Sequence, residues 1–448
     1  MSADRKQPQP PEDGAATGAG ATSLLLSHAR LADGRAVDVR LVGDRIEAVG
    51  TAGSLGPVAG GARVDLTGHL LLPAPAEPHA HADTALSADS PGPAPYDVPC
   101  DGSYDVPCDG SYDVPCDGEE VQRRATEAAL LQLGHGATAL RAHVRIAAGR
   151  GLTSLDAVLR TRRSLHGLGE LTPVAVPRLL TGVAGAEERA LLRDAVRRGG
   201  VVVGGRPDGD PDPAGHLEAV LTVAAEHGVP ADLHTEGDDP VWLARLAAMA
   251  GELGAGVTIG PCAGLARLPS EVAGRAAERL AAAGVAVVCL PQGGCGEAGS
   301  RGVAPVGLLR AAGVRVAAGS GALRDAANPV GRGDPLEAAY LLASQGGLAP
   351  EEAYGAVSAE ARAVLGLPEV RVEAGFPAEL LAVRGERLAG VLSLAYSRIV
   401  VHRGRVVART SAVREYCDSA AALDLPRQAR TKRPPEPGGP QAGPVVRS

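Results

Sequence analysis

Short apolar segments alternate with amphipathic segments along most of the chain. Strands are predicted at 70–74, 137–143, 173–177, 200–204, 230–234, 256–260, 285–290 and 314–318. Helices are predicted in the intervals, for example at 119–133, 153–165, 214–227 and 240–253. Eight such units indicate an α/β fold, a parallel (β/α)8 TIM-type barrel. A doubly wound sheet would give a similar pattern, but no G-x-G-x-x-G follows the first strand.

Both ends of the barrel pattern are flanked by shorter alternating strands. LLLSHARL, AVDVRLVG and DRIEAVG come first, with turns at Gly34 and at the pair Gly43-Asp44. Further strands are predicted at 378–384, 392–404 and 405–410. Neither group has enough strands to form a stable sheet alone. We therefore predict a barrel over 70–367 and one small β-sandwich domain built from both chain ends, residues 22–69 and 368–412.

Three segments depart from this pattern. Residues 1–21 and 420–448 are rich in Pro and Gly and are predicted to be disordered tails. The octapeptide YDVPCDGS recurs over 96–118, directly after the first predicted strand. Its cysteines and carboxylates could bind a soft metal, and the insertion could cover the barrel mouth. A replicated surface loop is the third alternative, and the pattern favours it because long surface loops cost little.

Composition narrows the classes of partner. A net charge of −8 argues against nucleic acid or an anionic membrane as the main partner. The sequence contains neither the roughly 18 consecutive apolar residues of a spanning helix nor an apolar signal core, which predicts a cytoplasmic protein. Seven cysteines without a C-x-x-C pair do not suggest a disulfide framework. A small-molecule substrate is the expected partner, and a homo-oligomer is left open.

Histidines lie where predicted barrel strands end. His79 and His81 follow the first strand, His143 ends the second and His234 ends the fifth. Alternate residues of an extended chain point the same way, and the carboxyl ends of barrel strands share one face. His79, His81 and His234 could therefore hold one divalent metal ion, zinc or iron, with an open position for water. The alternative for the H-x-H is a pair of surface histidines in a loop.

Other polar residues near these strand ends are candidates for the remaining roles. Glu236 and Asp238 follow His234 closely, and either could carry a proton from attacking water to the leaving group. A solvated acidic loop is the equal alternative. Arg178 and His143 are expected to line a substrate pocket, because a guanidinium can clamp a carboxylate or a polar ring edge. The alternative for Arg178 is an ordinary salt bridge.

Three segments carry a resemblance to a known family: LLLPAPAEPHAHADTAL, GATALRAHVRI and PADLHTEGDD. Together with the divided small β domain, they resemble the amidohydrolase superfamily, in particular its cytosine deaminase branch, over residues 23–410. The resemblance implies a barrel with a small β sandwich and metal-dependent hydrolysis of non-peptide C–N bonds, often in nitrogen heterocycles. It also implies that His79, His81 and His234 are metal ligands.

Several positions depart from the family pattern and indicate a degenerate active site. Gly237 stands where the family has its catalytic glutamate, and Pro261 where it has a further histidine. Ser320 stands at the family's metal-binding aspartate, with Asp325 further along as an additional candidate ligand. Arg178 replaces a substrate-reading glutamine. Two main hypotheses follow: a metal-dependent hydrolase of weakened activity, or a catalytically inactive barrel that binds a small molecule or a protein. A third, weaker hypothesis is that the cysteine-containing repeat is the functional element and the barrel only presents it.

Overall fold

The computed structural model describes residues 23–57, 59–89, 117–149, 151–251, 256–293 and 302–412. Both predicted tails and all but the last two residues of the repeat segment 96–118 lie outside these ranges. The predictions made for them therefore stay predictions. Among the described helices, none combines the length and the apolar character needed to cross a membrane.

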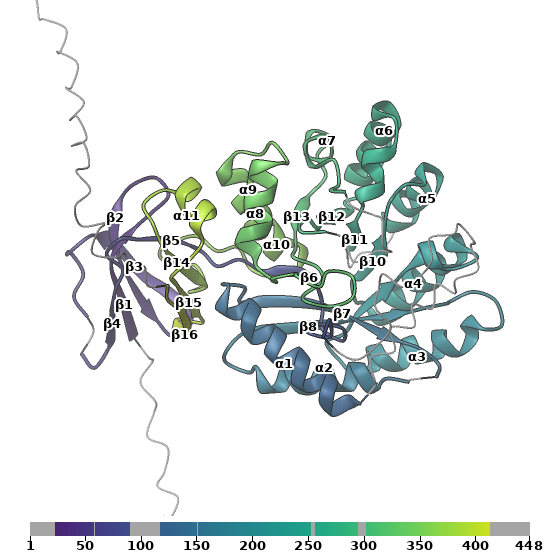
Figure 1. Ribbon diagram of the computed structural model, residues 1–448, viewed down its shortest axis with the longest axis horizontal. Coiled ribbons are helices and arrows are strands. Elements are labelled where there is room, and N and C mark those ends of the chain that lie inside the picture. The colour runs from purple at the N-terminus through teal and green to yellow at the C-terminus, as the bar shows by residue number, and fades with distance from the viewer. Residues whose placement is uncertain are drawn as a thin grey trace, which may run out of the picture. The chain divides into compact units, whose positions relative to one another are not determined.

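Eight parallel strands form the barrel in chain order (Figure 1). They are β6 (Glu77–His81), β7 (Ala139–Ile146), β8 (Glu170–Pro177), β9 (Val202–Gly205), β10 (Ala231–Thr235), β11 (Val257–Pro261), β12 (Ala286–Cys289) and β13 (Val316–Ala318). A parallel bridge between Ala80 and Gly321 joins the segment after β13 to β6 and closes the ring. The Glu77 carboxylate reinforces this closure, because it accepts hydrogen bonds from the Ser320 backbone N–H and hydroxyl. The predicted barrel is confirmed.

Helices surround these strands (Figure 1). They are α1 (Gly118–Gly134), α2 (Thr153–Ser164), α3 (Gly185–Arg197), α4 (Pro213–His227), α5 (Pro240–Ala250), α6 (Ser270–Ala282), α7 (Val306–Ala311), α8 (Pro335–Ser344), α9 (Pro350–Val357) and α10 (Ala359–Val364). Asp212, Asp239 and Asp334 cap α4, α5 and α8 through side-chain acceptors, each just before a proline at the first helical position. An aspartate cap followed by proline is a strong helix start, which explains where these helices begin.

The first predicted strand, 70–74, belongs to the other sheet, so its assignment to the barrel is wrong. β5 (His69–Pro73) pairs antiparallel with β14 (Leu380–Arg384), and the barrel begins instead with β6, which contains the two histidines. Leu70 and Leu72 pack in the larger apolar core, whereas Leu71 packs in the core of the smaller sheet. An apolar run indicates burial on both faces but not which sheet the strand joins.

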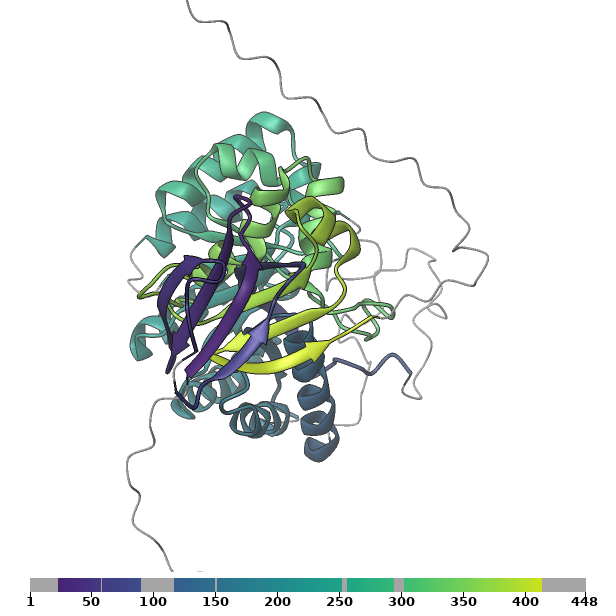
Figure 2. The ribbon, with the colours of Figure 1, turned by 90° about the vertical axis from the view of Figure 1, so that its left-hand side faces the viewer.

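The smaller sheet is assembled from both ends of the described chain, as predicted (Figure 2). It contains β1 (Ser23–Arg30), β2 (Ala36–Val42), β3 (Arg45–Thr51), β4 (Ala62–Asp65), β5, β14, β15 (Arg398–His402) and β16 (Arg405–Thr410). Strands of both halves contribute to one apolar core. The strand predicted at 392–404 starts later than expected, because α11 (Leu388–Leu394) occupies the beginning of that segment.

We expect Leu71→Ala to lower the free energy of unfolding by about 2–5 kcal/mol, because it leaves a cavity in the smaller core. The Leu71 side chain is 1% exposed. The matched control is Leu131→Ala on α1, where the leucine is 40% exposed and we expect about 0.5 kcal/mol or less. Thermal unfolding followed by calorimetry measures the difference. Equal shifts in the two variants would contradict the packing described for β5.

Candidate metal centre

Four histidines converge inside the barrel. His79 and His81 lie on β6, His143 on β7 and His234 on β10. His81 is paired in register with His143 on the neighbouring strand, and His79 points to the same side as His81 because strand residues alternate. The ring centroids of His79 and His143 are 3.9 Å apart, and those of His79 and His234 are 5.3 Å apart. The structure thus brings together four predicted site residues from three strands.

Three of these histidines could hold a metal ion. His79, His81 and His234 each offer one ring nitrogen, and these nitrogens all lie within 4.8 Å of one another. Among the described residues, both ring nitrogens of His79 and the Nε2 atoms of His81 and His234 are buried without a hydrogen-bond partner. A buried polar atom left unpaired costs about 1–3 kcal/mol, whereas a metal ion would satisfy all three rings. The donor set therefore fits a metal ion.

The protonation of these rings suits metal binding. Burial, together with the nearby His143, lowers the pKa of His81 to about 3. Burial also lowers the pKa of His79 and that of His234 well below the usual histidine range. Metal ligation requires the neutral imidazole, so these rings are in the form that binds.

A second group, His79, His143 and Asp232, also has ligand atoms within 4.8 Å of one another. The Asp232 oxygens are already engaged, however. Oδ2 lies 3.0 Å from Nη1 of Arg141, and Oδ1 lies 3.3 Å from Nε2 of His143. Burial alone would raise the pKa of Asp232, but His143 and Arg141 hold it below its usual value. Asp232 is therefore an ionised acceptor that holds its neighbours, and the three-histidine group is the better candidate for a metal.

The two predicted proton carriers differ in their surroundings. The Glu236 side chain is 21% exposed, and its Oε2 lies 3.9 Å from Nη1 of Arg267. The Asp238 side chain is 54% exposed and pairs with the same arginine at 2.8 Å. Between them, Gly237 has a φ of +69°, a conformation that side-chain-bearing residues rarely adopt. Glu236 is thus the more enclosed carboxylate and lies just before the turn.

Two other predicted site residues are not brought into the histidine group. The Asp325 carboxylate accepts hydrogen bonds from Thr84 Oγ1 at 2.7 Å and from the backbone N–H groups of Ala327 and Asn328. It is buried, yet it does not belong to either group of converging ligand atoms. Arg178 is exposed after β8, and no hydrogen bond described in the structure joins its side chain to the histidines.

Sequence reasoning missed several residues of this centre. Arg141 and Asp232 lie two positions before His143 and His234 on the same strands, so each shares a face with its histidine. The alternation of side chains along a buried strand could have indicated that Arg141 and Asp232 lie near the histidines. Arg206 follows β9, and its positive charge contributes to lowering the pKa of His81 and that of His234. Its position in a loop gave no comparable signal.

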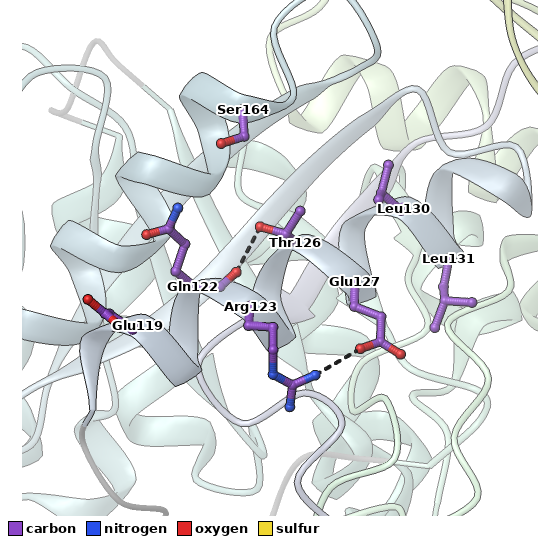
Figure 3. A pocket seen from close by; sticks show the side chains of 8 residues that line it. All are labelled: Glu119, Gln122, Arg123, Thr126, Glu127, Leu130, Leu131 and Ser164. Atoms are coloured by element: carbon purple, nitrogen blue, oxygen red, sulfur yellow. Dashed lines mark hydrogen bonds and ion pairs between the residues drawn. The ribbon is translucent and has the colours of Figure 1, made fainter.

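A separate hollow of about 640 Å³ lies on the outer side of α1 and is lined by residues of α1 and by Ser164 of α2. Figure 3 shows its lining, with Arg123 directed toward Glu127 and Thr126 bonded to the backbone of Gln122. Nη1 of Arg123 lies 3.3 Å from Oε2 of Glu127. None of its lining residues belongs to the histidine group. The hollow is therefore not part of the candidate metal centre.

Comparison with known proteins identifies the family of the chain. Residues 110–408 match the model of the amidohydrolase family, a span that covers most of the barrel and the second half of the smaller sheet. The chain belongs to the amidohydrolase family. This amidohydrolase is 30% identical over 312 residues to a pterin deaminase from Rhizobium rhizogenes strain K84, covering 65% of this chain and 70% of the relative.

Two further relatives are similar over a longer span. An N-isopropylammelide isopropyl amidohydrolase from Pseudomonas sp. strain ADP is 25% identical over 411 residues, covering 87% of this chain and 98% of the relative. The crystal structure of N-isopropylammelide isopropylaminohydrolase from Burkholderia multivorans is 27% identical, with a TM-score of 0.75, over 88% of this chain and all of that one. The structural match to the Burkholderia multivorans protein therefore extends over most of the chain of this amidohydrolase.

Proposed function

We propose that this amidohydrolase hydrolyses an exocyclic C–N bond of a small nitrogen heterocycle, with one divalent metal ion held by His79, His81 and His234. The observation that carries the proposal is the convergence of buried ring nitrogens that lack protein partners. Neutral imidazole donors suit zinc or iron. Membership of the amidohydrolase family supports the same class of reaction.

The bound ion would supply a hydroxide at neutral pH by lowering the pKa of its water to about 7. In the proposed reaction, water adds to the ring carbon, the C–N bond breaks, and ammonia or an amine leaves. Glu236 would take the proton from the water and give it to the leaving nitrogen, since its carboxylate is the less exposed of the two candidates. His143 would line the pocket beside the ion, and Arg178 would reach a polar edge of the substrate from the loop after β8.

The relatives suggest which heterocycles to test. One is named for deamination of a pterin, and two are named for hydrolysis of N-isopropylammelide. The experiment incubates the metal-loaded protein with pterin, N-isopropylammelide and cytosine, and measures release of ammonia or isopropylamine. We expect at least one compound to be hydrolysed above the level of a His79→Ala preparation purified in parallel. Failure of a fully metal-loaded protein with this panel and with related amino-heterocycles would count against the proposal.

The second candidate function is a barrel that binds a small molecule without catalysis. The residues at positions 261 and 320 favour it. The hydroxyl of Ser320 donates to Glu77, so that side chain is engaged in closing the barrel. Pro261 offers no side-chain donor or acceptor at the end of β11. Isothermal titration with the same heterocycles separates the two candidates. Binding by the metal-loaded protein without release of an amine would favour the binding barrel.

A further inference from the structure

A buried ion pair between Asp232 and Arg141 holds His143. The proposed reaction does not use this ion pair directly. The side chains of Arg141, His143 and Asp232 are almost completely buried, at 3%, 3% and 0% exposed. Asp232 Oδ1 faces Nε2 of His143 at 3.3 Å, and Oδ2 faces Nη1 of Arg141 at 3.0 Å. Arg141 is fixed in turn, because its Nη2 donates to the backbone carbonyl of Val364 at 3.2 Å.

This arrangement determines where a single proton sits on the His143 ring. An ionised carboxylate only accepts hydrogen bonds, so the ring nitrogen that faces it must donate. A singly protonated ring therefore carries its proton on Nε2 and leaves a lone pair on Nδ1. That Nδ1 atom is buried and has no hydrogen-bond partner among the described residues. The His143 ring stacks on His79 with 3.9 Å between ring centroids and lies 5.6 Å from the ring of His81, so it is beside the candidate metal ligands.

We propose that Asp232 and Arg141 are positioning residues that hold His143 as its Nε2–H tautomer, so that Nδ1 is a fixed hydrogen-bond acceptor for an N–H or amino group of the substrate. The substrate part of this inference rests on the proposed function, whereas the tautomer does not. A buried acceptor built to receive a hydrogen bond rejects an analogue that lacks the donor. The site would therefore prefer heterocycles with a free ring N–H or amino group over their N-alkylated analogues at that position.

The tautomer is tested by NMR on zinc-loaded full-length protein in which only histidine carries ¹⁵N. The His143 signals are assigned by their loss in His143→Gln. We expect one proton on the ring, on Nε2, in the wild-type protein. A proton on Nδ1, protons on both nitrogens, or a His143 nitrogen bonded to zinc would each overturn the positioning role. In Asp232→Asn, a carboxamide can donate or accept, so we expect both tautomers to appear. If the Asp232→Asn variant does not fold, the wild-type spectrum still shows which nitrogen of His143 carries the proton.

The acceptor role is tested by kinetics with the panel compound that is hydrolysed. His143→Phe keeps a stacking ring but removes the acceptor, and we expect KM to rise about ten- to a hundredfold with kcat within about threefold. A merely structural role would not raise KM selectively for the compound with the free N–H over its N-methyl analogue. An unchanged KM would overturn the acceptor role. If no compound is hydrolysed, the proposed function fails, while the NMR measurement still decides the positioning role.

Discussion

Replacing His79 or His234 with alanine is expected to reduce the bound metal from about one ion per chain to nearly none. Two imidazoles cannot satisfy an ion that prefers four ligands, and these histidines supply two of the three converging nitrogens. Hydrolysis should fall by roughly a thousandfold or more, because water that is not bound to a metal has a pKa of about 15.7 rather than about 7. Mass spectrometry of metals in protein purified without chelators measures the first effect.

Two control variants make this test specific. His166→Ala removes an exposed histidine just after α2 and should leave the metal content unchanged. Asp325→Asn removes a carboxylate that is already bonded to Thr84 and to two backbone N–H groups, so it should also retain the metal. Metal retained in full by both His79→Ala and His234→Ala would overturn the three-histidine site. Metal lost from Asp325→Asn would make that residue a ligand after a rearrangement of its loop.

The sequence was sufficient to predict the barrel and the convergence of His79, His81 and His234. Both predictions use simple geometry, since parallel strands end on one face and alternate strand residues share a side. The error at 70–74 has an equally simple cause. Leu70, Leu71 and Leu72 are buried on both faces of β5. A run of buried apolar residues has the same sequence pattern in either sheet. Only the long-range pairing with β14 shows that this strand belongs to the smaller sheet.

The polar contacts of the centre were harder to predict. Asp325 is close to the strand ends in sequence, but its loop turns the carboxylate toward its own backbone. Arg141 and Asp232 come from strands far apart in the chain, and their pairing across 91 residues is a tertiary contact. Local sequence patterns do not predict such an ion pair unless both residues are already known to lie on the same face of the barrel strands. The positions of the histidines could have supplied that placement.

Replacing Glu236 with glutamine is expected to lower kcat by roughly 10²–10⁴-fold while the metal content stays near one ion per chain. Glutamine is almost the same size but cannot take a proton from water. The following residue, Gly237, has a φ of +69°, where a glutamate would be strained, so the acidic side chain precedes the turn. The rate is measured with the panel compound that is hydrolysed.

Asp238→Asn is the matched control for this substitution, because Asp238 is also acidic and also pairs with Arg267 but is 54% exposed. We expect its kcat within about twofold of the wild type, since exposed polar groups outside the centre contribute little. If Glu236→Gln keeps full activity, the next carboxyl to test is Asp208, which accepts hydrogen bonds from Thr235 and from the Glu236 backbone. An inactive Asp208→Asn that retains its metal would then assign the role to it.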